Sequence, residues 1–207
     1  MKKTKWGIKI ALAASFMISA AVGLGSNNVD AATGNQGYAI YRDGVFFNAT
    51  DHAGIMNKPD TNSYTNPIIH HSGSGYVDFT TYVGFLNGKN FIGVYRPNGT
   101  VTSANRDTFV GTARTLQTEN ITYSLAFQVN YKDFEVGTYV EPSEITEMRC
   151  DGVVEYIYEW ANFKVFGSST NWDVSKATLA NKDEHRATQV TPRTQKNYLT
   201  LVQTSKP

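Results

Sequence analysis

The amino-acid sequence predicts a single α+β domain, with a β-rich first half and a second half that contains two helices. Short segments between residues 37 and 97 alternate aromatic or β-branched residues with polar ones, and turn residues separate them. Residues 105–117 and 150–161 instead repeat apolar residues at helical spacing. The chain is 41% hydrophobic and contains 12 Tyr, 11 Phe and 3 Trp, which supports a packed core and argues against disorder.

The first half predicts a series of antiparallel strands. The segment GYAIYRDGVFF begins at Gly37 with alternating residues and contains Asp43-Gly44, a dipeptide typical of hairpin turns. A second such dipeptide, Asn87-Gly88, precedes another β-like segment. After the first segment, strands are expected at residues 52–56, 67–71, 76–86 and 90–97.

The second half adds helices to the expected sheet. Apolar residues recur at helical spacing in the first helix, at Phe109, Val110, Ala113 and Leu116. Cys150–Ala161 is the clearest helix, with one apolar face and glutamates on the other. A polar stretch, Glu141–Arg149, precedes it, and Pro142 and Ser143 are candidate helix-start residues. Further strands are expected at residues 122–131 and 197–204.

Residues 1–31 have the features of a secretory signal peptide. Four lysines within the first nine residues precede an apolar run from Ile10 to Leu24, and Val29-Asp30-Ala31 forms a small-x-small cleavage site. Residues 32–207 then form the single predicted domain of an exported protein. The cleavage site has no cysteine, so a lipoprotein anchor is not expected.

The charge and composition of the remaining chain exclude several classes of protein. The leader contains four of the 19 basic and one of the 18 acidic residues, which leaves 15 against 17 and a net charge of −2. Without a basic stripe, a nucleic-acid partner is not expected. No later apolar run reaches the ~18 residues of a membrane span. No zinc-type ligand spacing is present, so neither a metal nor another cofactor is expected.

Cys150 is the only cysteine, so it cannot form an internal disulfide. It is either a buried small apolar residue or a reactive thiol. Its position at the start of a predicted helix favours the thiolate, and the backbone N–H groups there could hold an oxyanion. The carboxylate of Asp151 would oppose thiolate formation, whereas Arg149 could offset that charge.

A cysteine nucleophile needs a base, and the chain has four histidines. His52 and His70 belong to predicted strands that are neighbours, so their side chains could lie side by side. Adjacent residues of a strand point to opposite faces, so only one of His70 and His71 can face His52. His185 lies in the charged segment NKDEHRA and is expected on the surface.

Three short motifs resemble the NlpC-type papain-like cysteine peptidases. The helix RCDGVVEYIYEWA is similar to their nucleophile helix, DHAGIM resembles their histidine strand, and PIIHHSGSG resembles the next strand. His52 and His70 precede Cys150, which is the order of the circularly permuted branch of that superfamily. This branch includes YiiX-like bacterial proteins and, more distantly, lecithin retinol acyltransferase.

The resemblance implies a permuted papain-like fold, with an antiparallel sheet or small barrel packed against helices that include the Cys150 helix. It implies Cys150 as nucleophile, His52 as base and His70 as the orienting residue, with His71 as the substitute for His70. The implied function is a secreted bacterial cysteine hydrolase that cleaves amide or peptide bonds, in peptidoglycan fragments. The alternatives are a lipid-directed amidase, esterase or acyltransferase that uses the same thiol, and a non-catalytic module that binds wall fragments or lipid.

Overall fold

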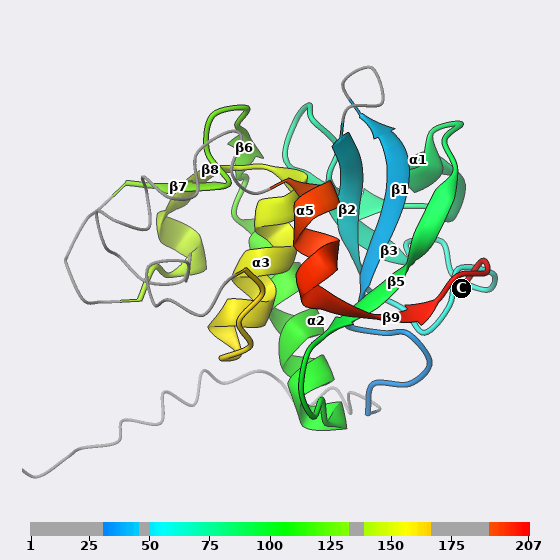
Figure 1. The fold of residues 1–207 in the computed structure, drawn as a ribbon. Coiled ribbons are helices and arrows are strands. Elements are labelled where there is room, and N and C mark those ends of the chain that lie inside the picture. The colour runs from blue at the N-terminus through cyan, green and yellow to red at the C-terminus, as the bar shows by residue number, and fades with distance from the viewer. Residues whose placement is uncertain (1–30, 46–49, 133–138, 167–190) are drawn as a thin grey trace, which may run out of the picture. The chain divides into compact units, whose positions relative to one another are not determined.

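The computed structural model describes residues 31–45, 50–132, 139–166 and 191–207; the expected signal peptide, up to residue 30, lies outside them. Its largest element is a six-stranded sheet in the order β4-β3-β2-β1-β5-β9, in which all neighbouring strands are antiparallel (Figure 1). The strands are β1 (Ala39–Val45), β2 (Thr50–Met56), β3 (Ile68–His71), β4 (Val77–Thr80), β5 (Phe91–Pro97) and β9 (Leu199–Gln203).

Strand β1 differs from the predicted hairpin at one point. The Asp43-Gly44 dipeptide does not turn the chain, because β1 continues to Val45 and pairs with Thr50 there. The register between β1 and β2 shifts between Arg42 and Val45, and Gly44 has a φ of 81°. The dipeptide therefore forms a bulge, a structure that uses the same left-handed glycine as a hairpin turn.

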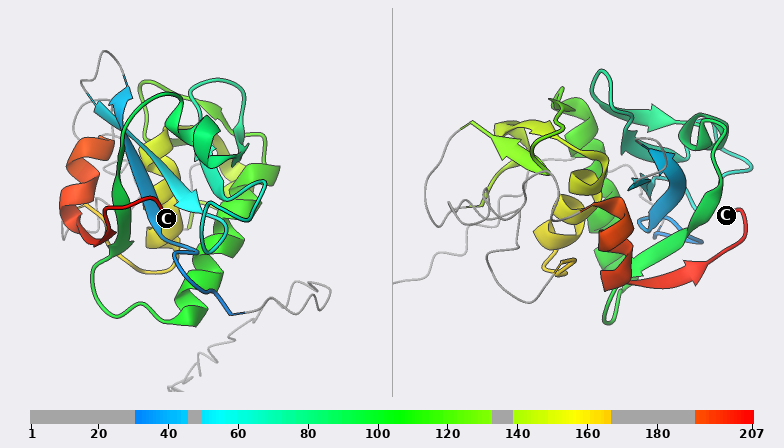
Figure 2. Two further views of the ribbon diagram at one scale, coloured as in Figure 1. Left: turned by 90° about the vertical axis from the view of Figure 1, so that its right-hand side faces the viewer. Right: turned by 45° about the horizontal axis from the view of Figure 1, so that its top comes forward.

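Helices cover both faces of this sheet. Figures 1 and 2 show α2 (Ser103–Thr118), α3 (Cys150–Trp160) and α5 (Pro192–Gln195) on one side and α1 (Tyr82–Leu86) on the other. Strand side chains alternate accordingly: Ala53 and Ile55 of β2 belong to the core beneath α3, whereas Met56 belongs to the cluster beneath α1. The carboxylate of Asp51, on the α3 side, accepts ion pairs from Arg193 and Lys196 of the C-terminal segment.

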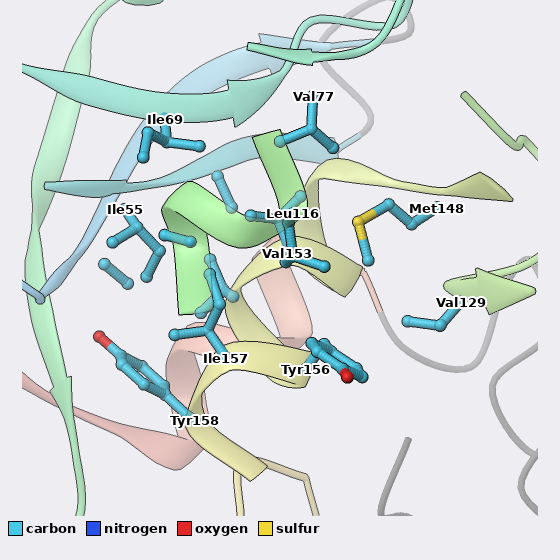
Figure 3. Close-up of a cluster of buried hydrophobic side chains, with 14 of the residues drawn as sticks. Ile55, Ile69, Val77, Leu116, Val129, Met148, Val153, Tyr156, Ile157 and Tyr158 are labelled. Carbon is cyan, nitrogen blue, oxygen red and sulfur yellow. The ribbon is translucent and has the colours of Figure 1, made fainter. Parts of the chain in front are cut away.

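The core beneath α2 and α3 is apolar and closed to solvent. Figure 3 shows Ile55 and Ile69 of the sheet, Leu116 of α2, and Val153 and Ile157 of α3 within one cluster. All five side chains are fully buried. The apolar faces predicted for the two helices are therefore the faces that they bury, and both helices begin and end within two residues of the expected bounds.

Helix α1 occupies a segment for which a strand was predicted. Residues 76–86 form the short strand β4 and then turn into α1, whose first turn is capped by the Thr81 side chain through the backbone N–H of Gly84. Asn87 ends the helix in the left-handed conformation, with a φ of 47°. The Asn87-Gly88 pair is thus a helix C-cap, because both a cap and a hairpin turn require left-handed residues.

A second, three-stranded sheet has the order β6-β8-β7, formed by β6 (Thr122–Tyr123), β7 (Val129–Tyr131) and β8 (Ile145–Met148). The strand predicted over residues 122–131 is therefore split. The polar stretch before Cys150 starts with the 3₁₀ turn Pro142–Glu144 and continues as β8, whose parallel pairing with β6 the sequence pattern did not indicate.

The fold is α+β, as predicted, with an antiparallel sheet packed against helices. Residues from Ala31 onward form one compact unit. Among the residues that the structure describes, no helix combines the length and apolar character needed to cross a bilayer.

Candidate functional site

The structure brings His52 and His70 together on the α1 face of the sheet. The Nε2 atom of His52 and the Nδ1 atom of His70 are 2.7 Å apart, and both side chains are buried. Gly54 lies between them on β2, and a Cβ at this position would be only 3.1 Å from the Cβ of His70. A larger residue at this position would therefore press on β3 at His70.

Phe85 of α1 covers the two histidines. Its ring centroid is 5.3 Å from that of His52 and 5.6 Å from that of His70. Burial, followed by the neighbouring imidazole and the Arg42 cation, holds the pKa of His52 well below its usual value. Burial and Arg42 lower the pKa of His70 to about 4. Both imidazoles are therefore neutral at pH 7.

The hydrogen bond between the imidazoles restricts their tautomers. One of the two nitrogens donates and the other accepts, since both rings are neutral. If His52 donates from Nε2, its Nδ1 carries no proton and is free to act as a base. No hydrogen bond to this Nδ1 is found within the described ranges, so His70 alone orients the ring.

His71 lies on the other face of β3 and has separate partners. Its Nε2 is 3.1 Å from the carbonyl oxygen of Ile121, its Nδ1 accepts from the backbone N–H of Gly73, and its ring contacts Tyr123. Both nitrogens are thus engaged, and in this structure His70 rather than His71 contacts His52. His185 lies outside the described residues.

Cys150 is the first residue of α3 and is only 5% exposed. The backbone N–H groups of Ala53 and Asp151 face the sulfur and favour its ionised form. Burial and the Asp151 carboxylate outweigh them and raise the pKa of the thiol to about 12. The helix start therefore does not by itself lower the pKa of this thiol, because the sulfur is almost completely buried beside the Asp151 carboxylate.

Asp151 is held by a buried polar network that the sequence pattern did not indicate. Arg149 donates to both carboxylate oxygens, at 3.0 and 2.8 Å, and the Gln128 amide donates at 3.0 Å. The same amide donates to Glu155 at 2.6 Å, and Gln195 also donates to Glu155, at 2.9 Å. These contacts fix the start of α3, and only Arg149 was identified beforehand, from its charge.

A pocket of about 290 Å³ opens where the end of β3 meets the start of β2. His52, from the α1 face of the sheet, and His71, from the other face, both line it. The other lining residues are Arg42, Ser72, Gly73, Tyr123 and Leu125. Negative charge on Cys150 would raise the pKa of both Arg42 and Tyr123, although Cys150 itself is not one of the residues that line the pocket. Arg42, Tyr123 and Leu125 were not predicted, because long-range pairing places them here.

Two kinds of contact that would support catalysis are not found among the described residues. No hydrogen bond joins the Cys150 sulfur to an imidazole nitrogen there. Nor does any group of three or more His, Cys, Asp or Glu side chains lie where it could hold a metal ion.

Comparison of the chain with protein-family models, curated proteins and solved structures gave no match.

Proposed function

We propose that this protein is a cysteine hydrolase of amide or peptide bonds, with Cys150 as nucleophile, His52 as general base and His70 as the residue that orients His52. The observation that carries the proposal is the 2.7 Å hydrogen bond between two buried imidazoles, one near the start of β2 and the other near the end of β3. The neighbouring residue of β2, Ala53, places its backbone N–H against the sulfur of Cys150. The proposed base, oriented by a second imidazole, and the proposed nucleophile at a helix start thus belong to elements that are in contact, β2 and α3.

The charge states favour a general-base reaction over a preformed thiolate–imidazolium pair. The high pKa of Cys150 and the low pKa of His52 leave both groups neutral at pH 7. The proton must therefore leave the sulfur as the sulfur attacks. Helix α3 and the His52 side chain lie on opposite faces of the sheet, so the reaction requires substrate binding to bring the thiol within hydrogen-bond reach of His52 Nδ1.

The proposed reaction consumes one water and one amide. The sulfur of Cys150 attacks the amide carbon while His52 Nδ1 takes the thiol proton, and backbone N–H groups at the start of α3 hold the oxyanion. The C–N bond then breaks, the amine leaves with the proton from His52, and a thioester remains. Water attacks this thioester with His52 again as base, which releases the carboxylic acid and restores the thiol.

Peptides of the bacterial cell wall are the substrate class that the sequence resemblance favours. A direct test is to incubate the protein with muropeptides and to measure new amino groups and a covalent adduct on Cys150 by mass spectrometry. Cys150→Ala should abolish turnover, and His52→Ala should lower kcat by about 10²–10⁴-fold, the usual contribution of a general base. Retention of hydrolysis by Cys150→Ala would refute the proposal.

The environment of Cys150 favours a second candidate, a non-catalytic binding module. Cys150 is buried, its pKa is raised and it makes no hydrogen bond to a histidine in the described ranges. A binding module should bind muropeptides equally well as wild type and as Cys150→Ala, with no thioester in either. Calorimetry on both forms, beside the turnover assay, separates the two functions.

A further inference from the structure

Arg42 is a buried cation whose positive charge has no carboxylate partner among the described residues. Its side chain is 8% exposed and lies opposite His52 in the register of β1 and β2. Its Nε donates to the carbonyl oxygen of Phe85 and its Nη1 to that of Asp43, at 3.0 Å. Both acceptors are neutral, so neither compensates the charge.

The acidic group next to Arg42 is engaged elsewhere. The carboxylate of Asp43 accepts from the backbone and side-chain nitrogens of Asn90, at 2.8 and 2.9 Å. The ring of Phe85, 6.0 Å from the Arg42 guanidinium carbon, adds a weak cation–π contact. Buried cations are normally paired with an anion, because an uncompensated charge is costly to remove from water.

Arg42 lines the 290 Å³ pocket beside His52. Its Nη2 has no hydrogen bond to any described group, so it retains donor capacity. The other side of the pocket supplies Tyr123, whose phenol stays protonated because burial and nearby negative charge raise its pKa, and the exposed aliphatic side chain of Leu125. A fixed cation, a neutral hydroxyl and an apolar wall together suit an aliphatic carboxylate.

We infer that this pocket binds a carboxylate, with Arg42 as the anion-binding residue, and that the acyl group of the substrate carries that carboxylate. The second part rests on the proposed hydrolase function; the first does not. Arg42 thereby becomes a specificity residue: an amide whose acyl part has a free carboxylate is hydrolysed in preference to the same compound with that carboxylate amidated.

Hexanoate and hexanamide are suitable probes, since they have nearly the same shape and differ in charge. Titration calorimetry at pH 7 should show hexanoate binding to the wild type, and hexanamide binding at least tenfold more weakly. This follows from a charge-assisted hydrogen bond, which contributes more than a neutral one. This comparison requires no variant, so it does not depend on whether a substitution at Arg42 folds.

The variant Arg42→Gln should weaken hexanoate binding at least tenfold and leave hexanamide binding unchanged. Arg42→Lys keeps the positive charge, so its affinity for hexanoate should lie between those of the wild type and Arg42→Gln. Arg106→Gln is the matched control, because Arg106 also donates to main-chain carbonyls and lies over an aromatic ring, that of Tyr38 at 4.6 Å, beside the other end of β1. It should bind hexanoate like the wild type.

The outcomes separate this inference from the proposed function. Equal binding of hexanoate and hexanamide, or equal hexanoate binding by wild type and Arg42→Gln, overturns the carboxylate site. The absence of saturable hexanoate binding to the wild type overturns it as well. If the wild type and Cys150→Ser both bind hexanoate more tightly than hexanamide, the anion site is supported. If the wild type also hydrolyses no amide, the hydrolase function is refuted while the anion site stands.

Discussion

Replacing Gly152 with alanine would place a Cβ 1.9 Å from the carbonyl oxygen of Gln128 and 2.8 Å from its carbonyl carbon. No rotamer relieves this contact, because both partners are backbone atoms. The start of α3 or the segment before β7 must therefore move. Overpacking of this kind costs about 1–3 kcal/mol or more, against the ~1 kcal/mol that alanine gains over glycine within a helix.

Gly111 of α2 is the matched control for this substitution. It is also inside a helix, but it is exposed and an added Cβ would meet no atom within 4 Å. Gly111→Ala should therefore stabilise the protein by about 0.5–1 kcal/mol, chiefly through helix propensity. The same chemical change thus has opposite expected signs at two helical positions.

Urea unfolding followed by circular dichroism measures both effects. Gly152→Ala should lower the midpoint at an unchanged m-value, and Gly111→Ala should raise it. In thermal unfolding, each kcal/mol corresponds to about 2–4 °C for a chain of this size. If Gly152→Ala is as stable as the wild type, the first turn of α3 does not lie against the Gln128 carbonyl. The position derived for Cys150 would then be wrong.

Three further predictions follow from charged and titratable groups. The folded-state pKa of His70, about 4, lies below the unfolded value of about 6.5, so the free energy of unfolding is highest above pH 6.5 and decreases as the pH falls towards 4. His70→Gln should remove up to about 3 kcal/mol of this pH dependence, measured by urea unfolding at a series of pH values. If the free energy of unfolding depends on pH in the same way in the variant and the wild type, the pKa assigned to His70 is wrong. Asp51→Asn should cost about 1–2 kcal/mol by breaking the ion pairs to the C-terminal segment, whereas Asp60→Asn, at a half-buried carboxylate that accepts from two backbone N–H groups of its own turn, should stay within about 0.5 kcal/mol in the same assay. Asp151→Asn should lower the pKa of Cys150 and speed its alkylation by iodoacetamide at pH 9; an unchanged rate in folded protein would show that burial alone controls the thiol.

Elements whose residue pattern and burial agree were predictable from the sequence. The helix over residues 105–117 and the strand over 90–97 have the periodicity that their buried faces require, and both are present. The errors at Asp43-Gly44 and Asn87-Gly88 have one cause. A left-handed residue serves a hairpin, a bulge or a helix cap equally well, so the dipeptide alone does not distinguish them.

Strand β8 was missed for a different reason. Its residues, ITEM, alternate weakly, and only the two outer positions are buried. What makes this segment a strand is pairing with β6 and β7, from residues about 20 positions earlier. Local patterning contains no information on such pairing, so tertiary contact decided the structure.

The only part of the candidate site that could be predicted from the sequence pattern was the choice between neighbouring strand residues, whose side chains alternate between the two faces of the sheet. Alternation alone required that a single member of the His70–His71 pair face His52, and the structure pairs His70 with it. The protonation state of Cys150 was not predictable, because it depends on how much water reaches the sulfur. Arg42 was not identified, since its role in the pocket follows from the register of β1 against β2 and from the absence of a described carboxylate partner.

Arg42, the proposed anion-binding residue, and His52, the proposed base, are electrostatically coupled, and this coupling predicts an effect of substrate on the pKa of His52. The Arg42 cation is one reason why the pKa of His52 is low, after burial and the neighbouring imidazole. A carboxylate bound to Arg42 would cancel part of that repulsion and make His52 a stronger base when substrate is present. The pKa of His52, measured from its ring-proton NMR signals, should therefore rise when hexanoate is added and stay constant with hexanamide. An unchanged pKa would mean that Arg42 and His52 act independently, and that carboxylate recognition adds affinity without assisting proton transfer.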